Sequence, residues 1–394
     1  MSGAPRRLHV FVLIDALGWD LAQRFGFLAD VLPYRAPLRT VLGYSSGAIP
    51  TMLTGKTPAE HGHWNLLYYD PVGSPFRWLR ALRFVPDRIL GARVTRKALK
   101  ELGRRVLGLG PLFDCAVPPR LLPYFNWIET RNIYAPRGIR GGPSIFDQLT
   151  TAGVPHRVYS YHRFRDAEIL RRARREVETG PATLFFLYLS ELDAFLHHHV
   201  EDVALLKDTF ARYEIALREL LVAARRRDAQ AGFTLLSDHG MTPIRRHHDL
   251  ARDIEGLGLR MLEDYLVVYD STMARFWFFS PHARASIVER LGSLSCGRIL
   301  SDDERGELGI RFADRRYGDL VFLLDPGWLV SSSDFSTPAW RPAGMHGYHP
   351  DDPSSDAIFL SNQEPPVPMR TIADAYACMA HAAALHETNA EAPR

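Results

Sequence analysis

The sequence lacks the features of a cysteine-stapled or membrane-spanning protein. It has only three cysteines in 394 residues, Cys115, Cys296 and Cys378, and their wide spacing leaves neither a disulfide framework nor a Cys-x-x-Cys metal site. No apolar run approaches the roughly twenty residues of a membrane span. The N-terminal apolar run 10–14 is too short for a signal peptide. We therefore expect reduced cysteines, no transmembrane segment and a cytoplasmic protein.

Excess charge and internal repeats are also missing. The net charge at pH 7 is only +3, which does not by itself indicate a stable nucleic-acid partner. Apolar residues make up 46% and charged residues 24% of the chain, as in ordinary globular proteins. Because 394 residues exceed the usual size of one hydrophobic core, we expect either two domains or one large domain with insertions.

Three short apolar runs indicate buried strands of a parallel sheet. They span residues 9–14, 183–189 and 233–236. Each run is apolar on both faces, as parallel strands covered by helices require. An acidic residue follows each of them: Asp15, Asp193 and Asp238. Since ligands collect at the carboxyl ends of strands in open α/β sheets, this pattern predicts an active site at that edge.

Helical patterns alternate with these strands and predict an α/β fold with a mostly parallel central sheet flanked by helices. Residues 202–227 have apolar positions spaced by three and four, and helices are also expected at 144–151 and 369–386. Two stretches interrupt the alternation. We interpret 71–139 as a basic and aromatic cap insertion and 261–340 as a second, small α+β cap. The predicted catalytic core then comprises 1–70, 140–260 and 341–390.

Several polar residues near the strand ends and in nearby motifs form a set of metal-ligand type. Its members are Asp15, Ser45, Asp193, His197, Asp238, His239 and His346. Carboxylates and imidazoles together suit Zn²⁺ or Mn²⁺ better than Ca²⁺ or a thiolate-bound metal. Seven ligands are too many for one tetrahedral ion, so the set predicts two divalent metal ions with the serine oxygen completing one shell.

Such a site suits displacement at phosphorus. Two ions roughly 4 Å apart stabilise both ends of an in-line displacement. Ser45 would take the phosphoryl group covalently, and water would then release it. Asn65 could donate its amide N–H to a phosphoryl oxygen as charge develops there. A serine at the start of a helix can also cap it, and the free N–H groups there attract anions.

The order of these residues resembles the type I phosphodiesterase/nucleotide pyrophosphatase family of the alkaline phosphatase superfamily. The similarity extends from residue 9 to about residue 360. Besides Asp15 after the first strand, it is carried by Ser45 nine residues before Thr54-Gly55, Pro-x-x-His-Gly at 58–62, Asn65 ahead of Tyr69-Asp70-Pro71, Asp-x-x-x-His at 193–197, Ser-Asp-His-Gly-Met at 237–241 and His-Gly-Tyr at 346–348.

The resemblance implies a three-layer sandwich like that of alkaline phosphatase, with cap insertions. It also implies two ions, usually zinc. One would lie on Asp193, His197 and His346, and the other on Asp15, Ser45, Asp238 and His239. The implied activity is that of a hydrolase of phosphoric ester or anhydride bonds with a covalent phosphoryl-enzyme intermediate. Its substrate would be an anionic phosphate ester, either a small molecule or a lipid or nucleotide conjugate.

The sequence departs from the family pattern at the nucleophile. The usual Thr-x-Pro-Asn is absent and the run reads Ser45-Ser46-Gly47-Ala48, so Ser46 is an alternative nucleophile, although the spacing favours Ser45. The interval from the His-Gly turn to Asn65 is one residue shorter than usual, so the substrate pocket is expected to differ from that of nucleotide-cleaving members.

Other functions on the same scaffold stay open. They are phosphomonoesterase, phosphonate hydrolase, headgroup phosphotransferase and a catalytically inactive binding relative. The arginine-rich segment 77–105 is either a solvated helix face or a surface for anionic substrates or acidic lipids. The aromatic residues of the first insertion either line a pocket or form the core of the cap; they are Trp78, Phe84, Tyr124, Phe125 and Trp127.

Overall fold

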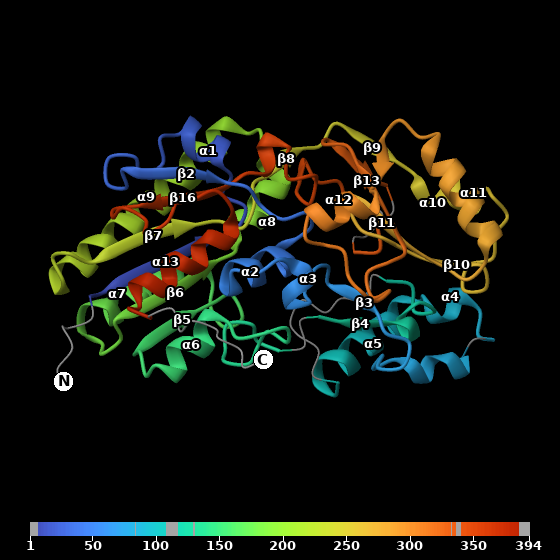
Figure 1. Ribbon diagram of the computed structural model, residues 1–394, viewed down its shortest axis with the longest axis horizontal. Coiled ribbons are helices and arrows are strands. Elements are labelled where there is room, and N and C mark those ends of the chain that lie inside the picture. Colours follow the sequence, from blue (N-terminus) through green and yellow to red (C-terminus); the bar gives the residue numbers. More distant parts are fainter. Residues whose placement is uncertain are drawn as a thin grey trace, which may run out of the picture.

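A mixed six-stranded sheet carries the predicted site. The computed structural model describes residues 7–82, 84–107, 117–128, 131–331, 333–335 and 340–385. The sheet has the order β2-β16-β7-β1-β6-β5 (Figure 1), with strands β1 (His9–Ile14), β2 (Tyr34–Leu38), β5 (His156–Tyr159), β6 (Leu184–Leu189), β7 (Gly232–Leu236) and β16 (Ala357–Ser361). β16 is antiparallel to the other five strands, which all run in one direction, so the predicted mostly parallel sheet is confirmed.

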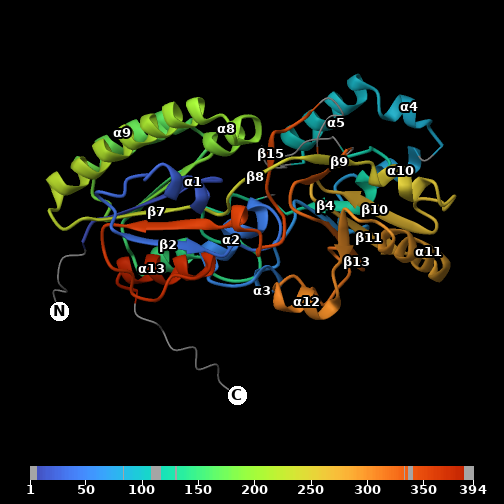
Figure 2. The ribbon, with the colours of Figure 1, turned by 90° about the horizontal axis from the view of Figure 1, so that it is seen from above.

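Helices cover both faces of this sheet. They are α1 (Trp19–Arg24), α2 (Ser45–Thr54), α6 (Ile145–Thr151), α7 (Asp166–Thr179), α8 (Glu191–His199), α9 (Val203–Arg227) and α13 (Ala375–Ala382). In β1, Val10, Val12 and Ile14 pack with α1, α7, α8 and α9, whereas Phe11 and Leu13 pack with α2, α6 and α13. This is the two-residue period of a strand buried on both faces. Figure 2 shows α8 and α9 on one side of the sheet and α13 on the other. The predicted three-layer sandwich is confirmed.

The second expected insertion contains an antiparallel sheet of its own. Its order is β10-β11-β13-β12, with β10 (Tyr265–Tyr269), β11 (Met273–Phe278), β12 (Gly297–Ile299) and β13 (Leu320–Leu324). Helix α11 (Pro281–Gly292) begins where the Ser280 side chain accepts a hydrogen bond from the Ala283 N–H, and it packs against this sheet. The stretch interpreted as a small α+β cap therefore contains both strands and a helix.

The first insertion is mostly helical and packs against the second. Two short elements precede it, α3 (Pro58–His61) and β3 (Leu67–Tyr69). The insertion itself contains the 3₁₀ turns η1 (Arg77–Leu82) and η2 (Leu122–Tyr124), the helices α4 (Asp87–Leu90) and α5 (Arg93–Arg105), and the strand β4 (Phe125–Trp127). Phe125 and Trp127 are buried in one apolar cluster with Trp277 of β11. Trp78 and Phe84 are exposed. The division into one core and two caps stays a prediction, but the two insertions share this cluster.

Short elements complete the described chain. They are β8 (Thr242–Pro243), β9 (Arg246–His248), α10 (Leu250–Glu255), α12 (Asp302–Glu307), β14 (Trp328–Val330), β15 (Gly344–Met345), η3 (Pro353–Ser355) and η4 (Ile372–Asp374). Cys296 and Cys378 are free and buried, as expected, whereas Cys115 lies outside the described residues.

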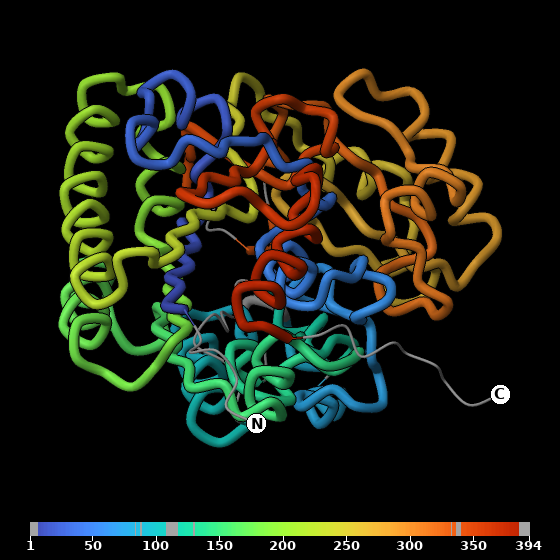
Figure 3. Tube along the Cα trace, turned by 60° about the vertical axis from the view of Figure 1, so that its left-hand side comes forward, coloured from blue at the N-terminus to red at the C-terminus, as the bar shows by residue number. Residues whose placement is uncertain are grey.

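The helix expected over 369–386 is shorter than predicted. Arg39 forms a β-bridge with Thr371, and Thr371 and Asp374 make a capping box, so an extended segment and η4 precede α13. Helix α13 ends at Ala382, and residues 386–394 lie outside the described chain. Figure 3 shows α13 (red) next to α2 (blue), which it contacts on the same face of the sheet.

Membrane-spanning helices were not expected. Within the residues that the structure describes, none of the helices has both the length and the apolar composition needed to cross a bilayer. The expected cytoplasmic location stays a prediction.

A buried histidine connects α2 to the turn after α3. His61 Nδ1 accepts a hydrogen bond from the backbone N–H of His63 at 3.2 Å, so its Nε2–H donates to Thr51 Oγ1 at 3.0 Å. Both ring nitrogens are satisfied only when the imidazole is neutral. Burial, followed by the charge of His63, lowers the pKa of His61 to about 3.

We predict that His61→Ala lowers the free energy of unfolding by about 1–3 kcal/mol at pH 7, because it leaves buried partners unsatisfied. The unfolded histidine takes up a proton below pH ~6.5, whereas the folded one stays neutral until about pH 3. The wild type should therefore lose stability as the pH falls below ~6.5, and the variant should lose less. Urea denaturation at pH 4.5 and 7 measures both, with the exposed His282→Ala as control; equal pH dependence in His61→Ala and wild type would contradict the prediction.

Candidate active site

Three neighbouring strands bring the predicted ligands to one edge of the sheet. Strand β1 lies between β7 and β6, and all three run in the same direction. Asp15 directly follows β1, whereas Asp238 and His239 come two and three residues after β7. Helix α8 begins after β6 and carries Asp193 and His197 in successive turns. His346 follows β15 and joins them from the C-terminal part of the chain.

One group of donor atoms surrounds His239. Its Nε2 lies 3.2 Å from Asp238 Oδ2 and 3.5 Å from Asp15 Oδ1. Asp15, Asp238 and His239 each offer a ligand atom within 4.8 Å of the others, and all three side chains are buried. Ser45 Oγ lies 3.0 Å from the same His239 nitrogen.

A second group shares His239 with the first. The donor atoms of Asp193, His239 and His346 also lie within 4.8 Å of one another. His346 Nε2 is 3.6 Å from Asp193 Oδ1, and the His239 and His346 rings stack with centroids 3.8 Å apart. His197 adjoins this group, because its Nε2 is 3.4 Å from Asp193 Oδ2. All seven residues predicted as ligands therefore belong to one continuous cluster.

Two of the imidazoles are oriented by backbone carbonyls. His239 Nδ1 lies 3.0 Å from the carbonyl of Gly240, and His197 Nδ1 lies 2.9 Å from that of Gly344. A ring nitrogen beside a carbonyl must carry the hydrogen, so Nε2 of each ring keeps its lone pair for the cluster. This arrangement is typical of metal-binding histidines.

The charges of the cluster are not balanced by the protein alone. Burial, then the negative charges of Asp238 and Asp193, raise the pKa of Asp15 well above its usual value. Burial opposes ionisation of Asp193 as well, but the hydrogen bond and charge of His197 hold its pKa below the usual range. Burial, then the neighbouring His239, lowers the pKa of His346. Three crowded carboxylates with imidazole nitrogens beside them favour a bound cation.

Unsatisfied buried atoms point to the same conclusion. Asp15 Oδ1, Asp193 Oδ1, Asp238 Oδ2 and His346 Nδ1 are buried and have no hydrogen-bond partner among the described residues. The three carboxylate oxygens are cluster atoms, each within 3.6 Å of an imidazole Nε2. Since buried polar atoms are nearly always paired, the donor set fits divalent cations.

The two adjacent serines have different partners. Ser46 Oγ is buried and donates to the backbone carbonyl of Trp64 at 2.7 Å, whereas Ser45 Oγ faces His239. Ser45 is the first residue of α2 and Tyr44 is its N-cap, with no side-chain capping bond. The expectation that the serine hydroxyl also caps the helix is wrong, because Ser45 Oγ is turned toward the cluster.

The predicted amide donor is fully buried next to Gly43, two residues before Ser45. Asn65 Nδ2 lies 3.4 Å from Asp270 Oδ2 and 3.6 Å from Met273 Sδ. Its Oδ1 has no hydrogen-bond partner in the described part of the chain. Asn65 therefore contacts the turn between β10 and β11 in the second insertion.

Comparison with known proteins agrees with this geometry. The family model for type I phosphodiesterase/nucleotide pyrophosphatase matches residues 10–349. The chain belongs to this family. As a member, it is a hydrolase that acts on phosphoric ester or anhydride bonds. The comparison with curated proteins gave no match.

Solved structures of low sequence identity share the fold of this family member. Murine ectonucleotide pyrophosphatase/phosphodiesterase 5 is 16% identical with a TM-score of 0.66, and the alignment covers 96% of this chain and 95% of that one. Its inactive variant in complex with AMP is 17% identical, with a TM-score of 0.65 and the same coverage. Phosphonoacetate hydrolase from Sinorhizobium meliloti in complex with phosphonoacetate is 15% identical, with a TM-score of 0.65 and 96% coverage of both chains.

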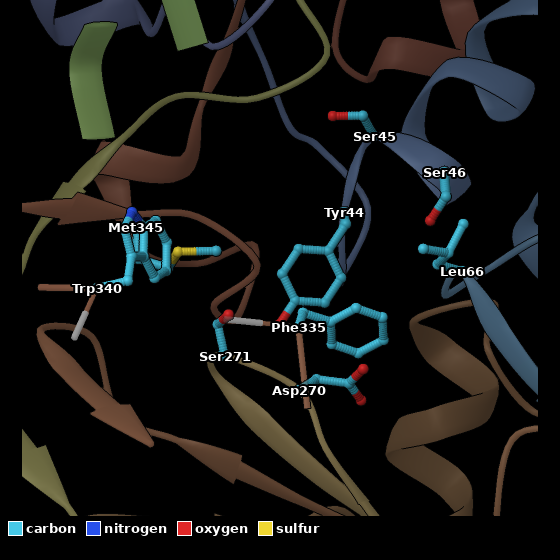
Figure 4. Close-up of a pocket in the computed structure, with 9 residues that line it drawn as sticks. All are labelled: Tyr44, Ser45, Ser46, Leu66, Asp270, Ser271, Phe335, Trp340 and Met345. Atoms are coloured by element: carbon cyan, nitrogen blue, oxygen red, sulfur yellow. The ribbon is translucent and has the colours of Figure 1, made fainter. Parts of the chain in front are cut away.

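A cavity of about 260 Å³ opens beside Ser45 in this phosphodiesterase-family chain (Figure 4). It is lined by Tyr44, Ser45, Ser46, Leu66, Asp270, Ser271, Phe335, Trp340 and Met345. Three of these side chains are aromatic, and no Lys or Arg occurs among these lining residues. Asp270 forms one wall of the cavity and also contacts Asn65, so the second insertion contributes directly to the site.

The sequence interpretation missed several residues of this site. The Tyr188 hydroxyl donates to Asp15 Oδ2, but Tyr188 reads as one more apolar residue of a buried strand. Asp270 and Arg275 form an ion pair with both side chains at 1% exposure or less. An arginine inside the otherwise apolar run 274–279 was the signal that could have identified this pair.

We predict that Asp238→Asn lowers stabilisation by zinc to that supplied by the other cation site, without lowering the melting temperature of the metal-free protein. The substitution removes a ligand charge and also relieves repulsion among Asp15, Asp193 and Asp238. In the wild type, zinc at a hundred times its Kd should add ~2.7 kcal/mol of stability. Thermal denaturation with and without zinc measures this.

The matched control is Asp253→Asn. Asp253 pairs with Arg290 and His248 outside the cluster, so this variant should melt earlier yet keep the full rise with zinc. A full zinc-dependent rise in Asp238→Asn would show that Asp238 holds no metal.

Proposed function

We propose that the chain is a metal-dependent phosphodiesterase or pyrophosphatase that uses Ser45 as its nucleophile. One observation carries the proposal. Ser45 Oγ lies 3.0 Å from His239 Nε2, and His239 belongs to both groups of closely spaced donor atoms. A nucleophile at the junction of two cation sites is the arrangement that in-line displacement at phosphorus requires.

The chain's own residues supply the nucleophile and its orientation. Ser45 Oγ attacks phosphorus on the side opposite the leaving oxygen, the bond to that oxygen breaks, and the phosphoryl group becomes esterified to Ser45. Water then attacks the same phosphorus and releases Ser45. The Ser46 hydroxyl is already committed to the Trp64 carbonyl, which supports Ser45 over Ser46. Asn65 donates an N–H to a phosphoryl oxygen as negative charge develops.

The donor atoms support two divalent ions. We assign one to Asp193, His197 and His346 and the other to Asp15, Ser45, Asp238 and His239. Carboxylates and imidazoles without thiolate favour zinc, with manganese as the alternative. When bound, these cations would supply positive charge that favours the deprotonated Ser45 hydroxyl and offsets charge on the leaving oxygen.

The cavity beside Ser45 favours diesters over monoesters. A phosphomonoester carries an additional charged oxygen, and none of the residues that line the cavity is a cation. Burying an unpaired charge is costly. A diester would instead place its esterified group among Tyr44, Phe335 and Trp340. A volume of about 260 Å³ suffices for an aromatic ring, since an apolar cavity of ~150 Å³ accepts benzene.

Phosphonate hydrolysis is the second candidate. The fold resembles that of phosphonoacetate hydrolase as closely as that of the nucleotide-cleaving relatives. A phosphonate is cleaved at a carbon–phosphorus bond, so the leaving group needs stabilisation as a carbanion rather than as an alkoxide or phenoxide. The apolar cavity supports the diester assignment over this one, because phosphonoacetate carries a further carboxylate.

We predict that Ser45→Ala lowers kcat for bis-para-nitrophenyl phosphate by about three orders of magnitude or more, because the covalent step is lost. Release of para-nitrophenolate by the zinc-loaded full chain measures it. Ser46→Ala is the control, and it should keep turnover within about ten-fold of wild type while losing the buried hydrogen bond to Trp64. If Ser46→Ala is the inactive variant, the nucleophile is assigned wrongly.

We also predict a clear order among esters of one phenol. The para-nitrophenyl diester should give a higher kcat/KM than the monoester by at least about ten-fold, because the third charged oxygen of the monoester has no cationic side chain in the cavity. Phosphonoacetate should be hydrolysed more slowly still. Equal or greater kcat/KM for the monoester would replace the diesterase assignment with a phosphomonoesterase, and a preference for phosphonoacetate would favour the phosphonate hydrolase.

A further inference from the structure

The turn between β10 and β11, residues 270–272, joins three segments of the active site. Asp270 contacts Asn65. Thr272 donates its backbone N–H to the Tyr44 hydroxyl at 3.1 Å, next to Ser45. The Thr272 hydroxyl donates to the carbonyl of Gly347 at 2.9 Å, next to His346. One turn of the second insertion thus holds the neighbours of Ser45 and His346 together with Asn65 itself.

Close packing fixes the position of this turn relative to Tyr44 and Gly347. Gly347 has a φ of +95°, and a Cβ there would lie 2.9 Å from both Thr272 Oγ1 and the Tyr44 ring. The glycine of the His-Gly-Tyr motif is therefore required both by its backbone conformation and by the space that the turn occupies. Movement of the turn would displace the residues on either side of it.

Asp270 is fixed by a buried ion pair. Arg275 Nε lies 2.6 Å from Asp270 Oδ2 and Nη2 lies 3.2 Å from Oδ1, and both side chains are at 1% exposure or less. The remaining Arg275 nitrogen, Nη1, donates to the carbonyl of Leu67 at 2.9 Å. The guanidinium therefore fixes Asp270 and also the backbone two residues after Asn65.

An ionised carboxylate decides which way the Asn65 amide faces. A carboxylate accepts hydrogen bonds and donates none, so it selects Nδ2 rather than Oδ1 as its neighbour. Asp270 also lines the cavity that contains Ser45, whereas Asn65 Oδ1 lies toward Gly43, where a Cβ would be 3.2 Å from it. With the amide reversed, its carbonyl oxygen would face both the Asp270 carboxylate and the charge developing on the phosphoryl group.

We propose that Asp270, held by Arg275, is a positioning residue that orients the Asn65 amide for its role at the phosphoryl group. The inference rests on the proposed function, because it assigns a partner to a residue of that mechanism. Nδ2 carries two N–H groups: one is directed to Asp270, and the other, which faces only the weak acceptor Met273 Sδ at 3.6 Å among the described residues, would serve the phosphoryl oxygen.

The burial of this pair argues for such a role. Replacing a buried ion pair by apolar residues is often neutral or stabilising, so the pair adds little to stability that a leucine would not supply. An apolar residue, however, cannot supply Asn65 with a charged hydrogen-bond acceptor at a fixed position. Residues that orient metal ligands through hydrogen bonds typically contribute about 10–100-fold to activity, and we expect an effect of this size from the partner of Asn65.

The test is a cycle built on the double variant Asp270→Leu/Arg275→Met, which leaves no unpaired buried charge. We expect this pair variant to lower kcat for bis-para-nitrophenyl phosphate by about 10–100-fold, with KM within about three-fold. Asn65→Ala should lower kcat by about 100-fold or more. Adding the pair change to Asn65→Ala should have no further effect, because Asp270 acts through Asn65. A wild-type kcat in the pair variant would overturn the proposal. So would a triple variant whose loss of kcat equals the loss in the pair variant multiplied by the loss in Asn65→Ala.

A second variant keeps the charge. Asp270→Glu retains a partner for Arg275 but moves the carboxylate by one methylene, so kcat should again fall at least about ten-fold while KM is kept. Wild-type kcat in this variant would likewise overturn the proposal. The control is Asp334→Asn. In the wild type the Asp334 carboxylate accepts a hydrogen bond from the Tyr269 N–H at 2.8 Å, and burial raises the pKa of Asp334 to about 7. It should keep kcat within about three-fold.

The melting temperature and its zinc-dependent rise, measured for every variant, separate loss of fold from loss of orientation. The test of the positioning role can be separated from the test of Ser45 as the nucleophile. The proposed function fails if Ser45→Ala retains turnover. The positioning role fails alone if turnover depends on Ser45 and Asn65 but not on Asp270.

Discussion

The arrangement of the site follows from charge crowding at the carboxyl ends of three adjacent parallel strands. Asp15 and Asp238 are buried and Asp193 is half-buried, with three imidazoles between and beside them. Carboxylates this close repel one another, and their unsatisfied buried oxygens have no compensating donors in the described protein. This crowding favours bound cations, and the catalytic chemistry proposed for Ser45 depends on them.

The segment predicted as the second insertion contacts residues of the proposed catalytic site. Its β10–β11 turn contacts Asn65 and the neighbours of Ser45 and His346. Its strand residue Trp277 packs with Phe125 and Trp127 of the first insertion, so the two insertions share an apolar cluster. The cavity beside Ser45 takes its lining from the core and from the second insertion, which is where substrate preference would diverge among relatives of similar fold.

Family membership and fold are clear although identity to the solved relatives is only 14–17%. The ligand pattern explains why so little identity suffices. A few carboxylates and imidazoles at strand ends define the chemistry, whereas the sheet needs only apolar residues with the right period. Gly240 of Ser-Asp-His-Gly-Met is neither a ligand nor an apolar strand residue. Packing requires a glycine there, because a Cβ would lie 2.1 Å from the Ser354 carbonyl oxygen.

The sequence alone determined three parallel core strands, the helices over 144–151 and 202–227 and the seven residues of the donor cluster, because apolar period and strand-end carboxylates are local signals. The family resemblance supplied the sandwich architecture. Tertiary structure alone decided three further contacts. Ser46 donates a hydrogen bond to the Trp64 carbonyl, Tyr188 donates one to Asp15, and Asp270, paired with Arg275, contacts Asn65. Apart from the Asp270–Arg275 pair, which is five positions apart, these contacts join residues from 18 to more than 200 positions apart. No local pattern encodes the long-range pairs, because their residues come together only when the whole chain folds.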